Sequence, residues 1–113
     1  MIQSVVESFP ADWRITVTVR RGGGVDRWGD PLPDATHEVA DCLIGEATSD
    51  EVEQFSEVSR LDAVMYAPVA ADVVSTDSID APASVWSPPR KWRVAGHPLF
   101  TPLGTKVPLS LEP

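Results

Sequence analysis

The sequence predicts a mainly β protein, a small β-barrel or sandwich of about six short strands with long loops and at most one short helix. Three observations favour this fold class. Apolar and polar residues alternate along several short segments, as they do in strands that are buried on one face. The 11 prolines lie mostly between these segments, where turns are expected. With 113 residues, 42% of them hydrophobic, the chain is expected to form a single barrel domain over 1–113.

The clearest strand is expected at 13–20, where apolar residues alternate with arginines and threonines. The apolar side chains share one face of such a strand and are expected in the core. They are Trp13, Ile15, Val17 and Val19. A long loop, 21–36, follows, because a run of glycines and a later Gly-Asp-Pro sequence exclude regular structure. We interpret the glycine run as a flexible hairpin tip.

Trp28 is the residue of this loop that points to a function. It is flanked by Arg27 and Gly29 in a polar segment, where a tryptophan is hard to bury. Tryptophan is enriched at the centres of protein interfaces, and long loops in compact domains are often functional. We therefore predict that Trp28 binds a partner, together with Arg27 and Asp30.

A second, shorter strand is expected at 38–44, followed by loop 46–59. Two interpretations of this loop remain open. Thr48 and Glu51 have the spacing of a helix capping box, which predicts one or two helical turns. The segment is also rich in acids without a basic neighbour, which suits a mobile acidic loop equally well. Four acids fall within residues 50–57: Asp50, Glu51, Glu53 and Glu57.

The second half of the chain is expected to contain four more strands, at 61–67, 71–77, 91–96 and 106–111. In the third of these, Trp92 and Val94 share the core face and Arg93 lies on the other. Pro108 removes a hydrogen-bond donor from the last strand, so that strand is expected at an edge of the sheet.

No residue pattern indicates an active site, and no metal or cofactor is expected. Cys42 is the only cysteine, so a zinc site with His37 would lack a second sulfur ligand. We interpret Cys42 as a small core residue, and a small enzyme with a Cys–His pair is the least favoured function. Asp72, Asp77 and Asp80 lack the spacing of an EF-hand, and turn formation is the better interpretation.

The charge of the chain is −8 and is unevenly distributed. Residues 1–33 are balanced, 34–80 carry twelve acids against Arg60 alone, and 81–113 have a net charge of +3. Tight nucleic-acid binding by the monomer is not expected, because it needs a basic stripe. No secretory signal or membrane-spanning run is present at the start or elsewhere, and a single thiol suits a cytoplasm.

The stretch 60–111 also carries a series of features in a characteristic order. They are Arg60-Leu61-Asp62, Ala67-Pro68, a polar turn over 72–80 with Asp77, then Trp92-Arg-Val-Ala-Gly-His-Pro98 with Phe100, and last Gly104-Thr-Lys-Val-Pro-Leu109. In this order they resemble the head-closure, or stopper, proteins of long-tailed bacteriophages, which belong to the head–tail connector. The first half matches only in kind, and Pro108 and Pro88-Pro89 depart from the pattern.

The resemblance implies a structural protein of the virion neck, assembled in the cytoplasm of the host bacterium. Copies of the barrel would form a ring under the portal or adaptor protein, hold the packaged DNA in the head and dock the tail terminator or tail tube. DNA would pass through the channel without sequence-specific binding. The four acids of segment 50–57 would face this channel and repel DNA phosphates. Uneven charge also suits a ring whose neighbours meet through different surfaces.

Two alternatives remain open beside this one. The first is a stand-alone binding module of the oligonucleotide-binding barrel type, which needs aromatic and basic residues interleaved on one face. Only 90–93, with Trp92, offers that pattern. The second is a tail protein similar to a tail terminator.

Overall fold

The computed structural model describes residues 13–84 and 87–112. Within them the element order is β1 (Ile15–Arg21), β2 (Ala35–Gly45), α1 (Ser49–Gln54), β3 (Ala63–Ala67), β4 (Ser78–Ala81), β5 (Arg90–Val94), β6 (Leu99–Thr101) and β7 (Gly104–Leu111). All strand pairs are antiparallel. The predicted mainly β fold is confirmed, with α1 as the short helix.

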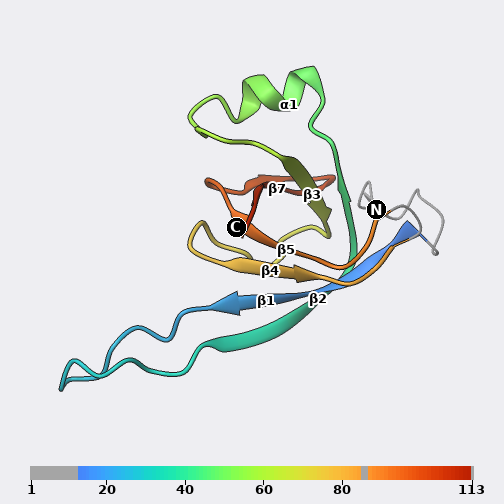
Figure 1. The fold of residues 1–113 in the computed structure, drawn as a ribbon. Coiled ribbons are helices and arrows are strands. Elements are labelled where there is room, and N and C mark those ends of the chain that lie inside the picture. Colours follow the sequence, from blue (N-terminus) through green and yellow to red (C-terminus); the bar gives the residue numbers. More distant parts are fainter. Residues whose placement is uncertain (1–12, 85–86, 113) are drawn as a thin grey trace.

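The sheet closes on itself. Strands β3, β2, β1, β4, β5 and β7 are hydrogen-bonded neighbours in this order, and β3 also pairs with β7. These six strands form a barrel, and β6 adds a short seventh strand beside β7 (Figure 1). Closure leaves few unpaired strand edges. The fold is therefore a barrel and not a sandwich.

A β-bulge marks the point at which β2 changes its partner strand from β1 to β3. Ile15 pairs with Cys42 but Val17 pairs with Val39, so β2 has one residue more than β1 across this interval. Asp41 takes up the extra residue with φ of 58°, a left-handed conformation that aspartate tolerates better than most residues. Bulges bend and twist a strand, and beyond this one β2 leaves β1 and pairs with β3.

The barrel interior holds most of the residues expected there. Val17 and Val19 are fully buried, and Trp92 and Val94 are buried against them, while Ile15 is half-buried at the edge of this core. Trp13 differs, because its exposed fraction is 40%. It precedes the first residue of β1, so no strand pairing directs its side chain inward. The expectation that Trp13 fills the core is wrong.

Two strand predictions are also wrong. Residues 71–77 do not form a strand. A tight turn lies at 75–76, where the carboxylate of Asp77 accepts a hydrogen bond from the Val74 amide (2.9 Å) and the Asp77 amide donates to the Val74 carbonyl (3.1 Å). The strand begins only after it, as β4. Pro108 lies in the interior strand β7 and not at an edge. On one side it lies opposite Val64 of β3, and on the other it falls between the residues of β7 that pair with β6 and those that pair with β5. Its carbonyl faces this second side and accepts from the Ala95 amide (2.8 Å), so the missing N–H would point into the same interval and not into the β3 ladder.

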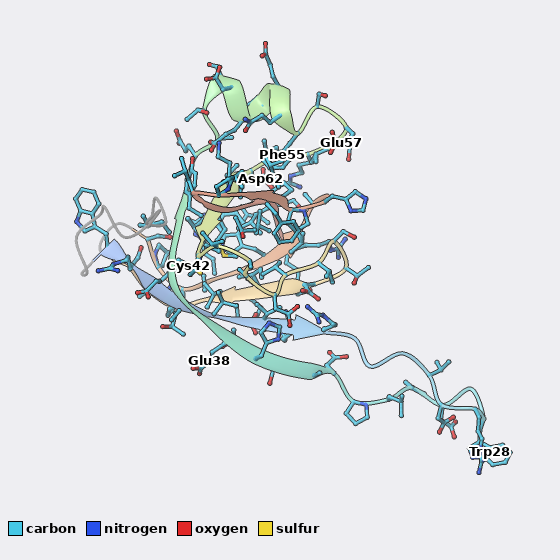
Figure 2. The ribbon with its side chains drawn as sticks, turned by 180° about the vertical axis from the view of Figure 1, so that it is seen from behind. Trp28, Glu38, Cys42, Phe55, Glu57 and Asp62 are labelled. Atoms are coloured by element: carbon cyan, nitrogen blue, oxygen red, sulfur yellow. The ribbon has the colours of Figure 1, made fainter. Side chains whose placement is uncertain are left out.

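The presence of helix α1 decides between the two interpretations of loop 46–59. The Thr48 side chain accepts from the Glu51 amide (3.2 Å), and the Glu51 carboxylate accepts from the Thr48 amide (2.9 Å). This is the capping box that the sequence predicts. Phe55, one residue beyond the helix, is 3% exposed and points from the helix towards the barrel (Figure 2). The helix is therefore packed and not a mobile loop.

Candidate partner-binding site

A long arm, residues 22–34, leaves the barrel between β1 and β2. In Figure 1 it extends far beyond the closed sheet, and Figure 2 shows Trp28 at its far end. Its two halves continue the antiparallel course of β1 and β2. Among residues 13–84 and 87–112, no side chain of the barrel covers Trp28, whose exposed fraction is 74%.

Hydrogen bonds between its two halves keep the arm ordered. The Leu32 amide donates to the Gly24 carbonyl (2.9 Å), and Val25 and Pro31 form an isolated β-bridge. Near the base, a β-carbon on Gly23 would lie 2.3 Å from the carbonyl oxygen of Pro33, so only glycine allows the two halves to approach this closely. The glycine run thus forms the base of the arm and not its tip, contrary to the sequence interpretation.

The tip is a turn organised by Asp26. Its carboxylate accepts hydrogen bonds from the amides of Trp28 (2.8 Å) and Asp30 (3.0 Å), the pattern in which aspartate replaces a backbone turn. Gly29 has φ of 84°, which a residue without a β-carbon adopts at no cost. The Arg27 guanidinium lies 4.7 Å from the centroid of the Trp28 ring, a cation–π distance.

The three residues predicted to bind a partner therefore share one turn. Trp28 and Arg27 stack on each other, and Asp30 is exposed beside them. Two further exposed apolar side chains of the arm are Val25 and Leu32. Sequence reasoning missed the part played by Asp26. Its signal was an aspartate with a glycine three positions later, a common turn pattern.

Ion pairs fix the base of the arm to the barrel. Arg21, the last residue of β1, donates two hydrogen bonds to the fully buried carboxylate of Asp77 (2.9 and 3.0 Å) and one to Asp72 (3.0 Å). Burial by itself raises the pKa of Asp77, but the bonds from Arg21 and the Val74 amide outweigh it and hold that pKa below its ordinary value. Asp77 thus carries a charge that anchors the arm.

These ion pairs bring together charges that lie far apart in the sequence. Arg20 of β1 pairs with Asp80 (2.9 Å) and with Glu112 (3.2 Å). The arginines of the first third of the sequence therefore neutralise acids of the middle block. Acidic and basic residues are therefore less separated in the folded protein than they are along the sequence.

The four acids of segment 50–57 differ in exposure, because one is buried and three are exposed. Glu51 is 2% exposed and accepts hydrogen bonds from the Thr48 amide and the Tyr66 hydroxyl, with Lys106 of β7 at 3.4 Å. Burial raises its pKa, yet these partners outweigh the burial and keep the pKa below the ordinary value. The expectation that Glu51 faces a channel is wrong, because its carboxylate caps α1 and joins the helix to the barrel.

The other acids of this segment lie on the outside of α1. Asp50, Glu53 and Glu57 are exposed, and Figure 2 shows Glu57 just beyond the helix. They are free to face a neighbouring molecule or solvent, but as part of a packed element.

A pocket of about 390 Å³ opens at the end of the barrel opposite the arm; we call it the end pocket. Its apolar wall includes Trp13, Ile15, Ile44, Ala63, Pro88 and Trp92. Polar residues also line it, among them Glu46, Asp62, Ser84 and Arg90. Because Ile15 begins β1 and Ile44 is near the end of β2, the pocket lies where these strands start and finish, away from the arm that joins them.

The cysteine lies in the core. Cys42 has no exposed surface, and burial, followed by the charge of Asp41, raises its pKa to about 12. A thiol with such a pKa is neutral and unreactive at neutral pH. Within residues 13–84 and 87–112, no three side chains of histidine, cysteine, aspartate or glutamate are grouped to hold a metal ion. No helix in the same residues is long and apolar enough to cross a membrane.

Comparison with known proteins adds information on the fold alone. No protein-family model matches the sequence, and no curated protein matches it significantly. Among solved structures, the chain is similar to the solution structure of protein SF1141 from Shigella flexneri 2a, with a TM-score of 0.61 and 17% identity. The similarity covers 90% of this chain and 94% of that one. The barrel, with its connections, is therefore an architecture that another natural protein shares.

Proposed function

We propose that this protein is a structural subunit of the neck of a long-tailed bacteriophage. Copies of it form a ring under the portal or adaptor protein, which closes the head, retains the packaged DNA and docks the tail. The observation that carries the proposal is the ordered arm with Trp28 exposed at its tip. The resemblance of 60–111 to head-closure proteins supplies the biological setting.

The arm is built for contact with another protein. Its conformation is held by its own hydrogen bonds, so little ordering entropy is lost when it binds. It presents a tryptophan and an arginine, two residue types that dominate the energy of protein interfaces. The Trp28 side chain is 74% exposed, so it contributes little apolar burial to the monomer.

The barrel favours association through projecting parts. Because the sheet is closed, few strand edges remain for another chain to extend. Contacts must then form between the arm and a differently shaped surface, and contacts between unlike surfaces generate rings when the rotation closes. The exposed acids Asp50, Glu53 and Glu57 would keep DNA from adhering to such a ring.

The experiment is reconstitution of this protein with candidate portal and adaptor proteins. Native mass spectrometry and electron microscopy of the mixture are expected to show a ring of this protein at the tail-side end of the portal complex. Trp28→Ala is expected to weaken docking about 30-fold or more, equivalent to about 2 kcal/mol, with monomer stability unchanged. Val69→Ala, an exposed residue outside the arm, is the matched control. Equal binding by Trp28→Ala and wild type would rule out the arm as an anchor.

The oligonucleotide-binding alternative is not favoured by the structure. Trp92, the aromatic residue of the basic segment 90–93, is 7% exposed and packs into the barrel, so its ring offers no stacking surface for a base. Fluorescence anisotropy with a labelled single-stranded oligonucleotide is expected to show no binding at physiological salt. Tight, salt-dependent binding would overturn the connector proposal in favour of that alternative.

A further inference from the structure

We infer that Trp28 of one copy inserts into the end pocket of the next copy. The inference rests on the proposed ring, and it names the two surfaces that join neighbouring subunits.

Arm and pocket lie at opposite ends of the same pair of strands. The arm begins after Arg21 and ends before Ala35, whereas the pocket is lined by Ile15 and Ile44 at the other end of β1 and β2. Figure 1 shows the arm leading away from the barrel. Trp28 therefore cannot reach the pocket of its own chain. A second copy can supply it, and contact between unlike surfaces repeats from copy to copy.

The pocket suits an indole ring in size and chemistry. Its volume of about 390 Å³ is at the lower end of the roughly 300–1,000 Å³ typical of pockets for small molecules. The apolar part of the wall, with Trp13, Ile15, Ile44, Ala63 and Pro88, offers a surface against which an indole ring can pack. The hydroxyl of Ser84 and the carboxylate of Glu46 lie in the lining and can accept the indole N–H.

The charges beside the tip match those of the pocket. Arg27 stacks on Trp28, and Glu46 in the pocket lining is its counterpart. Asp30 lies in the same turn, and Arg90 in the lining is the opposite charge for it. Within the described residues neither Glu46 nor Arg90 forms an ion pair. A second copy, whose tip carries one base and one acid, is therefore the occupant that matches the charges of the pocket.

The arm is long enough for this contact. From Gly22 to Trp28 the chain advances by six residues, and an extended strand rises about 3.3 Å per residue, so the tip reaches about 20 Å beyond the barrel. That length lets Trp28 enter the end pocket of a neighbouring barrel.

Cross-linking between two variants tests the inference. Val25→Cys places a thiol on the arm and Ser84→Cys places one in the pocket lining, and neither removes a proposed charge. Cys42 is fully buried and does not compete for a short bismaleimide linker. When the two variants are mixed at high concentration, alone and with the portal complex, a Val25→Cys/Ser84→Cys product is expected. A mixture of Val25→Cys with Val69→Cys, an exposed site away from the pocket, is the control and is expected to yield at least about tenfold less.

Charge reversal provides a second readout. Arg27→Glu in the arm variant, or Glu46→Arg in the pocket variant, is expected to lower the yield about tenfold, and the two together to restore it. Equal yields with the pocket and control sites, or no restoration in the double reversal, would overturn the inference. A ring on the portal complex without the pocket cross-link would overturn it while leaving the connector function intact. The cross-link without portal binding would support it and overturn the connector function.

Discussion

The four tryptophans show how the surroundings of a side chain decide its role. Trp92 alternates with charged residues along β5 and is buried in the barrel. Trp28 lies in a turn that the chain itself stabilises, outside any core. Trp13 lies between these cases, as part of the wall of the end pocket. Trp86 falls outside the described residues. One residue type thus serves as core, as pocket wall and as exposed anchor.

Trp92→Ala is expected to lower the free energy of unfolding by roughly 3–5 kcal/mol, because it leaves a large cavity in the core. Trp92 pairs with Ile79 of β4 and with Leu111 of β7, so the cavity would reduce packing against both neighbouring strands. Urea denaturation followed by circular dichroism measures it. An unfolding midpoint equal to that of wild type would place Trp92 at the surface and revive the oligonucleotide-binding alternative.

At the scale of elements, two short segments owe their order to one carboxylate each. Asp26 closes the turn of the arm, and Glu51 caps α1 and joins it to Tyr66 and Lys106. Both carboxylates accept backbone amide hydrogen bonds that the chain would otherwise leave unsatisfied. Each makes a segment of a few residues behave as a defined element.

Asp26→Ala is expected to loosen the tip of the arm while leaving Trp28 in place. Docking to the portal complex should weaken about tenfold, because a mobile tip must be ordered on binding. The barrel itself should keep its stability, since Asp26 contacts only the turn. Asp26→Asn keeps an acceptor oxygen and is expected to restore most of the binding, as measured by surface plasmon resonance. Equal affinity for Asp26→Ala and wild type would show that preorganisation of the arm is unimportant.

Glu51 should make the stability of the protein depend on pH. Its pKa is lower in the folded protein than the ordinary 4.5, so its charged form stabilises the fold above that pH and the stabilisation is lost as pH falls through the folded-state pKa. Glu51→Gln is expected to lose roughly 1–3 kcal/mol at pH 7 and to show a smaller further loss at acidic pH than wild type. Glu53→Gln, an exposed neighbour, should follow wild type. Parallel pH profiles for Glu51→Gln and wild type would contradict this role.

For the whole molecule, a net charge of −8 makes identical copies repel each other. Contact between arm and pocket must overcome this repulsion, and a closed barrel offers little other surface for association. Ring formation is therefore expected on a partner complex, which gathers the subunits, and not in dilute solution.

Sedimentation velocity of the isolated protein at low concentration is expected to show a monomer or a weak oligomer. Added salt screens the repulsion and should increase self-association at higher concentration. Trp28→Ala should remove this increase, whereas Val69→Ala should keep it. A stable dimer at nanomolar concentration would contradict the expectation.

The sequence by itself determined the features that depend on near neighbours. Alternation in β1 and β5 sets which side chains face inward, because successive residues of a strand point to opposite sides. The Thr48–Glu51 spacing predicts the start of α1, since the capping box closes within four residues. The polar residues beside Trp28 in the sequence predict that its side chain is exposed, because this also depends on near neighbours.

The tertiary structure alone decided the rest, because it depends on residues far apart in the chain. Closure of the barrel requires β3 to pair with β7, and burial of Glu51 requires Tyr66 and Lys106 from those two strands. Pro108 is tolerated in an interior strand because it lies between the stretch of β7 that pairs with β6 and the stretch that pairs with β5. The end pocket joins residues from 13 to 92, and no local pattern contains the information that brings them together.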